Sequence, residues 1–203
     1  STTINHNLGV IPEMMWIKNR DKQTRPSWAV YHKAIGTYYG PSGTTGGVLT
    51  LSSDAAVHDT GVNSTSWWRD QPPDENAFYL GAIDETCQIG SSYIGYLFAT
   101  LAGVSKVGSY TGNGSSQTIN CGFSSGARFV LIKRTDSTGD WYYWDTARGI
   151  VAGNDSHLSL NTTAAAVTSD DSVDPQNSGF IVNQVSATNI NVSSASYIFY
   201  AIA

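Results

Sequence analysis

The 203-residue sequence is poor in charge and contains no long apolar segment. Only 13% of its residues are charged, about half the share of an ordinary globular domain, and its net charge is −5. Because no Lys- or Arg-rich run occurs, the sequence lacks the basic surface that binds nucleic acid or an anionic membrane. Without an apolar run of about 18 residues, no membrane insertion is predicted.

Cysteine is also scarce. Cys87 and Cys121 are the only two, so a framework of several disulfides is excluded. They could form one bridge, but their positions are unrelated in the internal repeat described below. We therefore expect two buried free thiols that act as small apolar residues. No His/Cys cluster has the spacing of a zinc site, and no cofactor is predicted.

Twenty glycines and abundant Ser, Thr and Asn separate short apolar segments, which is typical of an all-β protein. Bulky and β-branched residues predict a hairpin from strands at 14–18 and 28–32, and a second hairpin at 129–133 and 141–145. The run at 93–103 is apolar on both faces, which favours a central strand of a sheet.

The first 21 residues occur twice. Ser1–Asp21 aligns with Ser116–Asp136 without a gap, and seven of the 21 pairs are identical, where chance would give about one. Later segments match at offsets that fall from 115 to 113, 109 and 101, the last from aligning Gly95 with Ser196. We interpret this pattern as a tandem duplication in which the first copy carries longer loops.

The repeat predicts two homologous units, residues 1–103 and residues 104–203, and the second includes a linker strand at 104–116. Each is predicted to be a β-sandwich of jelly-roll or concanavalin-like type. The linker strand has no counterpart before the first copy. We therefore expect the chain to be a piece of a longer polypeptide.

Long strings of both copies carry a family resemblance. KVGSYTGNG (106–114), GFSSGARFVLIKRTDSTGDWYYWDTARGI (122–150) and the terminal SYIFYAIA (196–203) resemble an uncharacterised repeated domain of tail-fibre-like virion proteins of marine bacteriophages, notably those of cyanobacteria. The first copy's GVIPEMMWIKNRD (9–21) is similar to the same domain. The resemblance implies a virion component with a lectin-like sandwich, and it supplies no catalytic or ligand residues.

Catalytic signatures are missing from the pattern, so no enzyme is predicted. The four histidines lie in no Ser/His/Asp arrangement. The acidic position shared by the copies, Asp21 and Asp136, is interpreted as a turn residue that accepts backbone N–H groups. Asp170, Asp171 and Asp174 could offer oxygens to Ca²⁺, but their spacing matches no known calcium loop, so no metal is predicted.

Aromatic residues suggest the binding site instead. Six Trp and eleven Tyr are many for so uncharged a chain, and sugars stack on aromatic faces. Trp28 and Trp141, which the copies share, are assigned to the core. Adjacent tryptophans in a polar loop cannot both lie on one strand face, so at least one is expected to be exposed. The predicted ligand-binding residues are Trp67, Trp68, Arg69, Asp70, Tyr38 and Tyr39.

Two functions remain open at this stage. The first is recognition of a cell-surface glycan or other host receptor by a virion fibre, mainly through the first copy. The second is a purely structural role, in which the aromatic residues pack against other virion subunits, with a homotrimer as one candidate assembly. Both place the protein in the virion.

Overall fold

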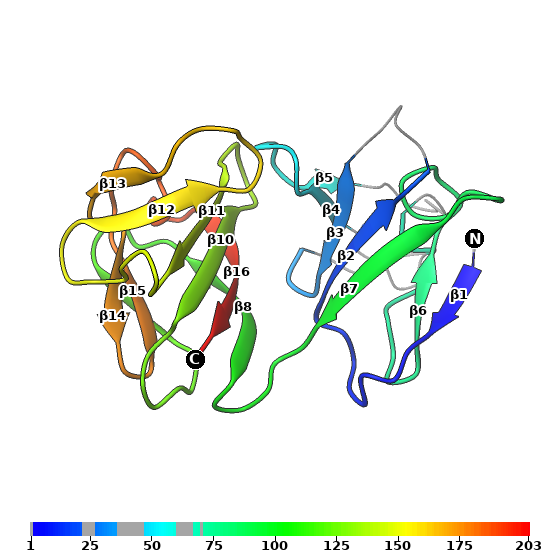
Figure 1. Ribbon diagram of the computed structural model, residues 1–203, viewed down its shortest axis with the longest axis horizontal. Coiled ribbons are helices and arrows are strands. Elements are labelled where there is room, and N and C mark those ends of the chain that lie inside the picture. The colour runs from blue at the N-terminus through cyan, green and yellow to red at the C-terminus, as the bar shows by residue number, and fades with distance from the viewer. Residues whose placement is uncertain (1, 22–26, 36–46, 60–66, 70) are drawn as a thin grey trace. The chain divides into compact units, whose positions relative to one another are not determined.

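The computed structural model describes residues 2–21, 27–35, 47–59, 67–69 and 71–203. These residues form strands β1 to β16 and no helix, so the predicted all-β class is confirmed (Figure 1). The chain divides into two compact units. Unit 1 comprises Ser1–Ser52 and Val57–Ala99, and unit 2 comprises Ser53–Ala56 and Thr100–Ala203.

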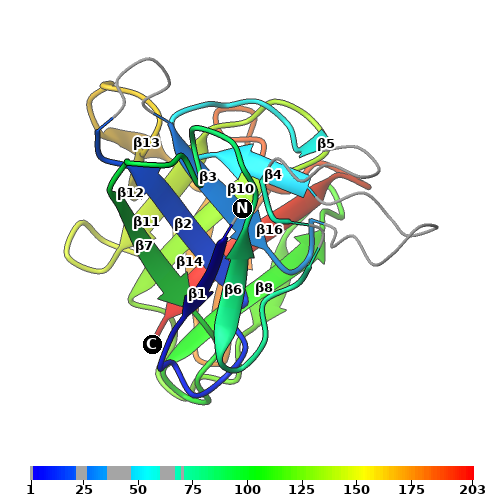
Figure 2. The same ribbon diagram turned by 90° about the vertical axis from the view of Figure 1, so that its right-hand side faces the viewer.

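Unit 1 contains two antiparallel sheets. Its strands are β1 (Thr2–Asn5), β2 (Met14–Asn19), β3 (Trp28–His32), β4 (Gly47–Thr50), β5 (His58–Asp59), β6 (Ala77–Leu80) and β7 (Tyr93–Phe98). Five strands form a sheet in the order β5-β4-β3-β2-β7, and β1 pairs with β6. Figure 1 and Figure 2 show the β1–β6 pair facing one side of the larger sheet. Buried side chains from β2, β3, β4 and β6 form the core between them.

Unit 2 has the same plan with additional strands. Its strands are β8 (Ser105–Thr111), β9 (Gln117–Asn120), β10 (Phe129–Arg134), β11 (Trp141–Asp145), β12 (Asp155–Ser159), β13 (Val167–Asp170), β14 (Val173–Gln176), β15 (Gly179–Val182) and β16 (Ser196–Ile202). The larger sheet has the order β13-β12-β11-β10-β16-β8, and the smaller has the order β14-β15-β9. One apolar cluster joins the facing sides of the two sheets.

Both predicted hairpins are confirmed, and they share one register. In unit 1, β2 pairs with β3 so that Lys18 lies opposite Trp28. In unit 2, β10 pairs with β11 so that Lys133 lies opposite Trp141. The alternation of bulky residues sets this pairing, because a shift of one residue would turn each apolar side chain to the other face.

The last strand of each unit corrects the sequence alignment. Ile17 on β2 pairs with Gly95 on β7, and Ile132 on β10 pairs with Phe199 on β16. Gly95 therefore corresponds to Phe199, which lies three residues beyond the position predicted by the offset of 101. YIGYLFA (93–99) thus aligns with YIFYAIA (197–203), so the predicted alignment of Gly95 with Ser196 is wrong.

The corrected register also changes the comparison of loops. Ala77 pairs with Asn5 in unit 1, as Gly179 pairs with Asn120 in unit 2. The chain is therefore longer in unit 1 between β4 and β6 than between β12 and β15. Between β6 and β7 it is shorter than between β15 and β16. The prediction that all length differences enlarge loops of the first copy is wrong.

β7 and β16 differ in their neighbours. β16 lies between β10 and β8, whereas β7 pairs with β2 alone among the described strands. The apolar run at 93–103 was expected to form a central strand, and for β7 this prediction is wrong. The reason is that β8, which lies in the predicted linker, pairs with β16 and has no described counterpart beside β7.

A tyrosine at the start of each last strand holds the preceding loop. The hydroxyl of Tyr93 donates to the Asp84 carbonyl oxygen at 2.8 Å and accepts from the N–H of Gln88 at 2.7 Å. In unit 2, the Tyr197 hydroxyl donates to the Asn189 carbonyl oxygen at 2.7 Å. Burial is the main cause that raises the pKa of both phenols, so they remain neutral donors.

The shared acidic position anchors the same strand. The carboxylate of Asp21 accepts the backbone N–H of Ser92. The carboxylate of Asp136 accepts the N–H of Ser196 at 3.1 Å. The prediction that this aspartate accepts backbone N–H groups is confirmed, although the donors lie at the start of the last strand and not within the hairpin turn.

The shared tryptophan is only partly a core residue. Trp141 is 1% exposed, whereas Trp28 is half-buried and packs on Tyr96, with ring centroids 5.8 Å apart. The core assignment is therefore confirmed for Trp141 and wrong for Trp28, whose surroundings leave part of the indole in solvent.

Trp141→Ala is expected to destabilise the protein by roughly 3 to 5 kcal/mol, because it removes a large buried side chain and leaves a cavity. Trp28→Ala is the matched control at the same position of the other hairpin, and it should cost clearly less. Chemical denaturation monitored by circular dichroism measures both. A larger loss for Trp28→Ala would contradict the burial difference.

Candidate functional site

The structure places one predicted binding residue in the core. Trp68 is 8% exposed and packs edge-on against Tyr31, with ring centroids 5.6 Å apart. Its indole Nε1–H donates to the carbonyl oxygen of Gly47 at 3.1 Å. A ring held in this way cannot stack on a ligand, so the expectation that Trp68 contacts ligand is wrong. The core beside β3 accepts the indole because its N–H finds a backbone partner there.

Trp67 and Arg69 remain accessible. Trp67 is half-buried against the same apolar cluster. Arg69 is exposed, has a positive φ of 42°, and donates from Nη1 to Thr3 Oγ1 at 3.1 Å. The other predicted site residues, Tyr38, Tyr39 and Asp70, lie outside the described residues.

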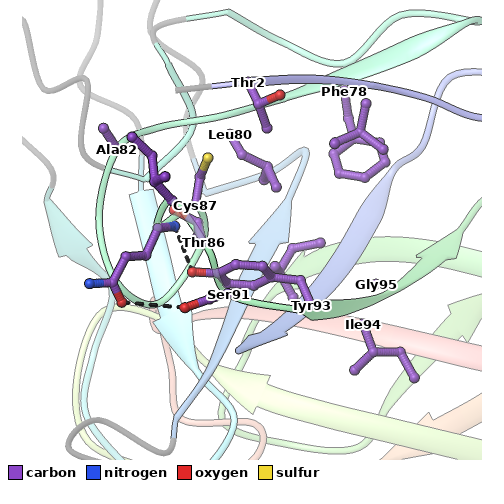
Figure 3. A pocket seen from close by; sticks show the side chains of 14 residues that line it. Thr2, Phe78, Leu80, Ala82, Thr86, Cys87, Ser91, Tyr93, Ile94 and Gly95 are labelled. Carbon is purple, nitrogen blue, oxygen red and sulfur yellow. Dashed lines mark hydrogen bonds between the residues drawn. The ribbon is translucent and has the colours of Figure 1, made fainter. Parts of the chain in front are cut away.

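Unit 1 contains a cleft with a volume of about 600 Å³. It lies between the β1–β6 pair and the β2–β7 part of the larger sheet, and residues 82–91 border it. Figure 3 shows Phe78 and Leu80 of β6 on one side and Tyr93 of β7 on the other. Its lining residues are Thr2, Ile4, Ile17, Phe78, Leu80, Ala82, Thr86, Cys87, Gln88, Ile89, Ser91, Tyr93, Ile94 and Gly95.

Unit 2 fills the equivalent space with an aromatic ring. Phe199, the counterpart of Gly95, is 4% exposed and packs edge-on against Phe180 with centroids 5.4 Å apart. Phe78 holds the Phe180 position in unit 1, but no ring projects from Gly95. The cleft therefore occupies a part of the sandwich that is core in unit 2.

The exposure of neighbouring residues reflects this difference. Ile4 on β1 is 37% exposed, whereas its counterpart Ile119 on β9 is 6% exposed. On the opposite face of the last strand, Ile94 is 36% exposed, whereas Ile198 is 2% exposed, so this second contrast does not arise from the ring at the Gly95 position. This cleft was not predicted from the sequence. Alignment of Gly95 with Phe199 would have indicated it, because a glycine then replaces an aromatic residue of the other copy.

The loop that borders the cleft is held by internal bonds. The amide of Cys87 donates to the Ile83 carbonyl oxygen at 2.8 Å, and Thr86 Oγ1 donates to the Gly81 carbonyl oxygen at 3.1 Å. Ile89 lies in this loop at the cleft and is fully exposed. The loop thus presents an apolar side chain at the rim instead of closing over the cleft.

The cleft is suited to binding by shape and apolar contact. Among the described residues that line it, none is charged or is a histidine, so the lining offers no acid–base pair. Its volume lies within the roughly 300 to 1,000 Å³ range of ligand sites. Two of its polar residues bond within the protein: the backbone N–H of Gln88 donates to the Tyr93 hydroxyl (Figure 3), and Thr86 Oγ1 donates to the Gly81 carbonyl oxygen.

Unit 2 contains a buried polar cluster beside a smaller cavity of about 180 Å³. Asp155 on β12 pairs in register with Asp170 on β13, and His157 lies on the same strand as Asp155. Asp155, His157 and Asp170 are all buried, as is Ser172. The backbone N–H groups of Ser172 and Val173 each donate to Asp155 Oδ2 at 3.0 Å.

This cluster does not form a nucleophilic triad. Ser172 Oγ lies 2.8 Å from Asp170 Oδ1 and 2.9 Å from Thr188 Oγ1. His157 Nδ1 lies 3.4 Å from Asp170 Oδ1, close enough for an electrostatic contact, but it makes no hydrogen bond among the described residues. The hydroxyl is therefore not activated by the imidazole.

The three acidic residues considered for calcium do not all have the same hydrogen-bond partners. Asp170 accepts from Ser172 in the buried cluster. Asp171 and Asp174 each accept from Asn183 Nδ2, at 3.1 and 2.8 Å. Within the described ranges, no three His, Cys, Asp or Glu side chains form a group that could hold a metal.

Burial controls the ionisation of the cluster. It is the main cause that raises the pKa of Asp155 to about 7, while the hydrogen bonds from Val173 and Ser172 oppose it. Burial also lowers the pKa of His157, against the attraction of Asp170. Both groups are therefore biased toward their neutral forms.

Comparison with known proteins places the chain in a family. A profile of the family described as a domain of unknown function, DUF7483, matches residues 1–203. The chain belongs to the DUF7483 family. Comparisons of the DUF7483 chain with curated proteins and with solved structures gave no match. In the part of the chain that the structure describes, no helix is long and apolar enough to cross a membrane.

The buried Asp155 predicts a pH-dependent stability. Its folded pKa of about 7 lies above its ordinary value of 3.8, so its contribution to stability is fully present below about pH 4 and is lost as the pH rises to about 7. His157 acts in the opposite direction, because its lowered pKa reduces stability as the pH falls below about 6.5.

Asp155→Asn removes the contribution of this carboxyl group to the pH dependence of stability, because the amide keeps an oxygen acceptor and does not titrate. Relative to this variant, the wild type should melt at progressively lower temperature as the pH rises from about 4 to about 8. Differential scanning calorimetry at several pH values gives the measurement, with Asp171→Asn as a control. A difference that does not change with pH would contradict the assignment.

The two thiols should differ in reactivity. Both are free, but Cys121 is buried while Cys87 is half-buried and lines the cleft. The expectation that both are buried is wrong for Cys87. Burial raises the pKa of the Cys121 thiol to about 12, so little thiolate is available there.

Iodoacetamide should therefore modify Cys87 in the folded protein and Cys121 only after unfolding. Peptide mapping by mass spectrometry identifies the modified site over time, and Cys87→Ser is the control. Faster labelling of Cys121, or a chain that has lost two hydrogens to a disulfide, would contradict this result.

Proposed function

We propose that the DUF7483 chain is a binding module of a virion fibre and that the cleft of unit 1 receives its partner on the host surface or in the virion. The resemblance of its long strings to tail-fibre-like proteins of marine phages supports the virion location. The module is proposed to have no catalytic activity, because the described residues that line the cleft include no charged residue and no histidine.

We further propose that both units are homologous sandwiches of jelly-roll or concanavalin-like type, with the repeat boundary near residues 103 and 104. The shared order of β4-β3-β2-β7 and β12-β11-β10-β16 supports this proposal. The shared hairpin register and the equivalent bonds of Asp21 and Asp136 support it as well.

The observation that carries the binding proposal is the contrast at Gly95 and Phe199. One sandwich core is filled by an aromatic ring, and the other is left open over about 600 Å³. An unfilled apolar cavity costs stability, and apolar surface gathered at an opening is typical of a binding site. The partner is expected to insert an apolar group between the two layers of unit 1.

Recognition of a glycan by the segment at Trp67 and Arg69 is a second candidate. Arg69 is exposed and holds a left-handed backbone conformation that is uncommon for a residue other than glycine. Trp67 is half-buried and its carbonyl oxygen accepts the N–H of Gly81 at 2.9 Å. An exposed arginine next to a tryptophan is a combination that binding surfaces favour.

Gly95→Phe tests the cleft directly, because it copies Phe199 into unit 1. A Cβ at Gly95 would lie 3.1 Å from Ile17 Cδ1. In unit 2, the counterpart of Ile17 is Ile132, which pairs with Phe199 and already accommodates its ring. The variant should keep or raise the melting temperature while it fills the cleft. Binding of the apolar dye 1-anilinonaphthalene-8-sulfonate should fall at least fivefold, and adsorption of labelled protein to cyanobacterial cells should be lost.

Tyr96→Phe, on the other face of the same strand, is the control and should change neither readout. If Gly95→Phe folds and adsorbs to cells as the wild type does, the cleft is not the binding site. If Trp67→Ala or Arg69→Ala abolishes adsorption instead, the glycan candidate replaces the cleft.

A further inference from the structure

The outer edge of β7 and the cleft lie on the same side of unit 1. In unit 2, β8 runs antiparallel along the outer edge of β16 over seven residue pairs. β7 occupies the β16 position in unit 1, and no strand among the described residues pairs with its outer edge. The edge of unit 1 on which no described strand pairs with β7 is also the edge where the cleft opens, since Tyr93, Ile94 and Gly95 line it.

β8 contributes side chains as well as backbone bonds. Tyr110 of β8 stacks on Tyr197, with ring centroids 4.9 Å apart and planes 13° apart. The Tyr110 hydroxyl donates to the Ile190 carbonyl oxygen at 2.6 Å. Gly108 lies opposite Phe199, and a Cβ at Gly108 would come within 2.4 Å of the Phe199 ring. In this pair, the large residue lies on β16 and the glycine on β8.

In unit 1 the glycine lies on the last strand itself, so a neighbouring strand would have to supply the large side chain. Tyr93 stands where Tyr197 stands, but the glycine, Gly95, is on the last strand. A strand placed beside β7 in the β8 register would meet empty space at Gly95, so it could carry a large side chain there. An aromatic group from a neighbouring strand that covers a glycine is a known way to stabilise a sheet.

The backbone of β7 is oriented to accept such a strand. The N–H of Arg20 donates to the Ser92 carbonyl oxygen at 2.9 Å, which directs the even-numbered residues of this strand toward β2. Because an antiparallel ladder alternates, the N–H and C=O groups of Tyr93, Gly95 and Leu97 point to the outer edge. Their counterparts on β16 face β8.

We infer that the outer edge of β7 is a docking site for an antiparallel strand of the β8 type, contributed by a further copy of the repeat unit, with a large apolar side chain opposite Gly95 that fills the cleft. This inference rests on the proposed function of the cleft as a binding site and names its partner. Strand addition at an exposed edge, with pockets for alternate side chains, is an established mode of peptide recognition. It also covers an edge that would otherwise invite aggregation.

Peptides derived from Ser105–Asn113 test the inference on the chain of residues 1–203. One peptide has the natural sequence SKVGSYTGN, and the other carries Gly108→Phe. Isothermal titration calorimetry should show that the wild-type chain binds the Gly108→Phe peptide at least tenfold more tightly. The Gly95→Phe chain should reverse this preference, because two rings cannot occupy one space.

Backbone pairing is tested with matched peptide modifications. N-methylation at residue 108 of the Gly108→Phe peptide removes an N–H that faces β7, and it should abolish binding. N-methylation at Ser109 removes an N–H that faces away, and it should change affinity less than threefold. Bound peptide should also slow the reaction of Cys87 with iodoacetamide, because Cys87 lines the cleft.

The inference would be overturned if the Gly108→Phe peptide did not bind the wild-type chain. It would also be overturned if the Gly95→Phe chain kept the same peptide preference, or if the two N-methyl groups had equal effects. These outcomes are distinct from failure of the proposed function. Loss of cell adsorption in Gly95→Phe without peptide binding would keep the cleft as a site and exclude a strand as its partner. If the Gly95→Phe chain reversed its peptide preference but still adsorbed normally to cells, strand docking would be confirmed and the cleft would be excluded from host binding.

Discussion

Coverage of the outer edge of the last strand controls how completely each unit closes its core. Backbone polar groups and apolar side chains of one strand are buried together. In unit 2, β8 pairs with β16, and Phe199 lies between the sheets under Tyr110. In unit 1, the same edge carries no described strand and the same position is Gly95, so the layers enclose a cleft.

The position of the last strand itself is not what differs. Tyr93 and Tyr197 hold the loops that precede these strands, and Asp21 and Asp136 hold their first backbone N–H groups. Each group has a fixed partner in both units. At the last strand, the units therefore differ in the side chain at the Gly95 position and in the strand that pairs with the outer edge, which is why a single substitution at Gly95 is an informative experiment.

The units also differ in how they use buried polarity. His157 lies on β12 in unit 2. The equivalent position on β4 in unit 1 is Val48, which belongs to an apolar core. Unit 2 thus covers its apolar core and keeps a buried group of aspartate and histidine side chains. Unit 1 has an apolar interior that remains partly accessible, and this division supports binding through unit 1.

Sequence alone was enough to predict the all-β class, the two hairpins and that Asp21 and Asp136 accept backbone N–H groups, because these depend on local alternation and on identical residues at fixed spacing. That these N–H groups belong to the start of the last strand came from the structure. Contacts in the folded chain show that β7 is an edge strand among the described strands, that Trp68 is core and that the cleft lies at Gly95. A run that is apolar on both faces fits a central or an edge strand until its neighbours are known. Burial depends on contacts between residues distant in the chain, which periodicity does not encode.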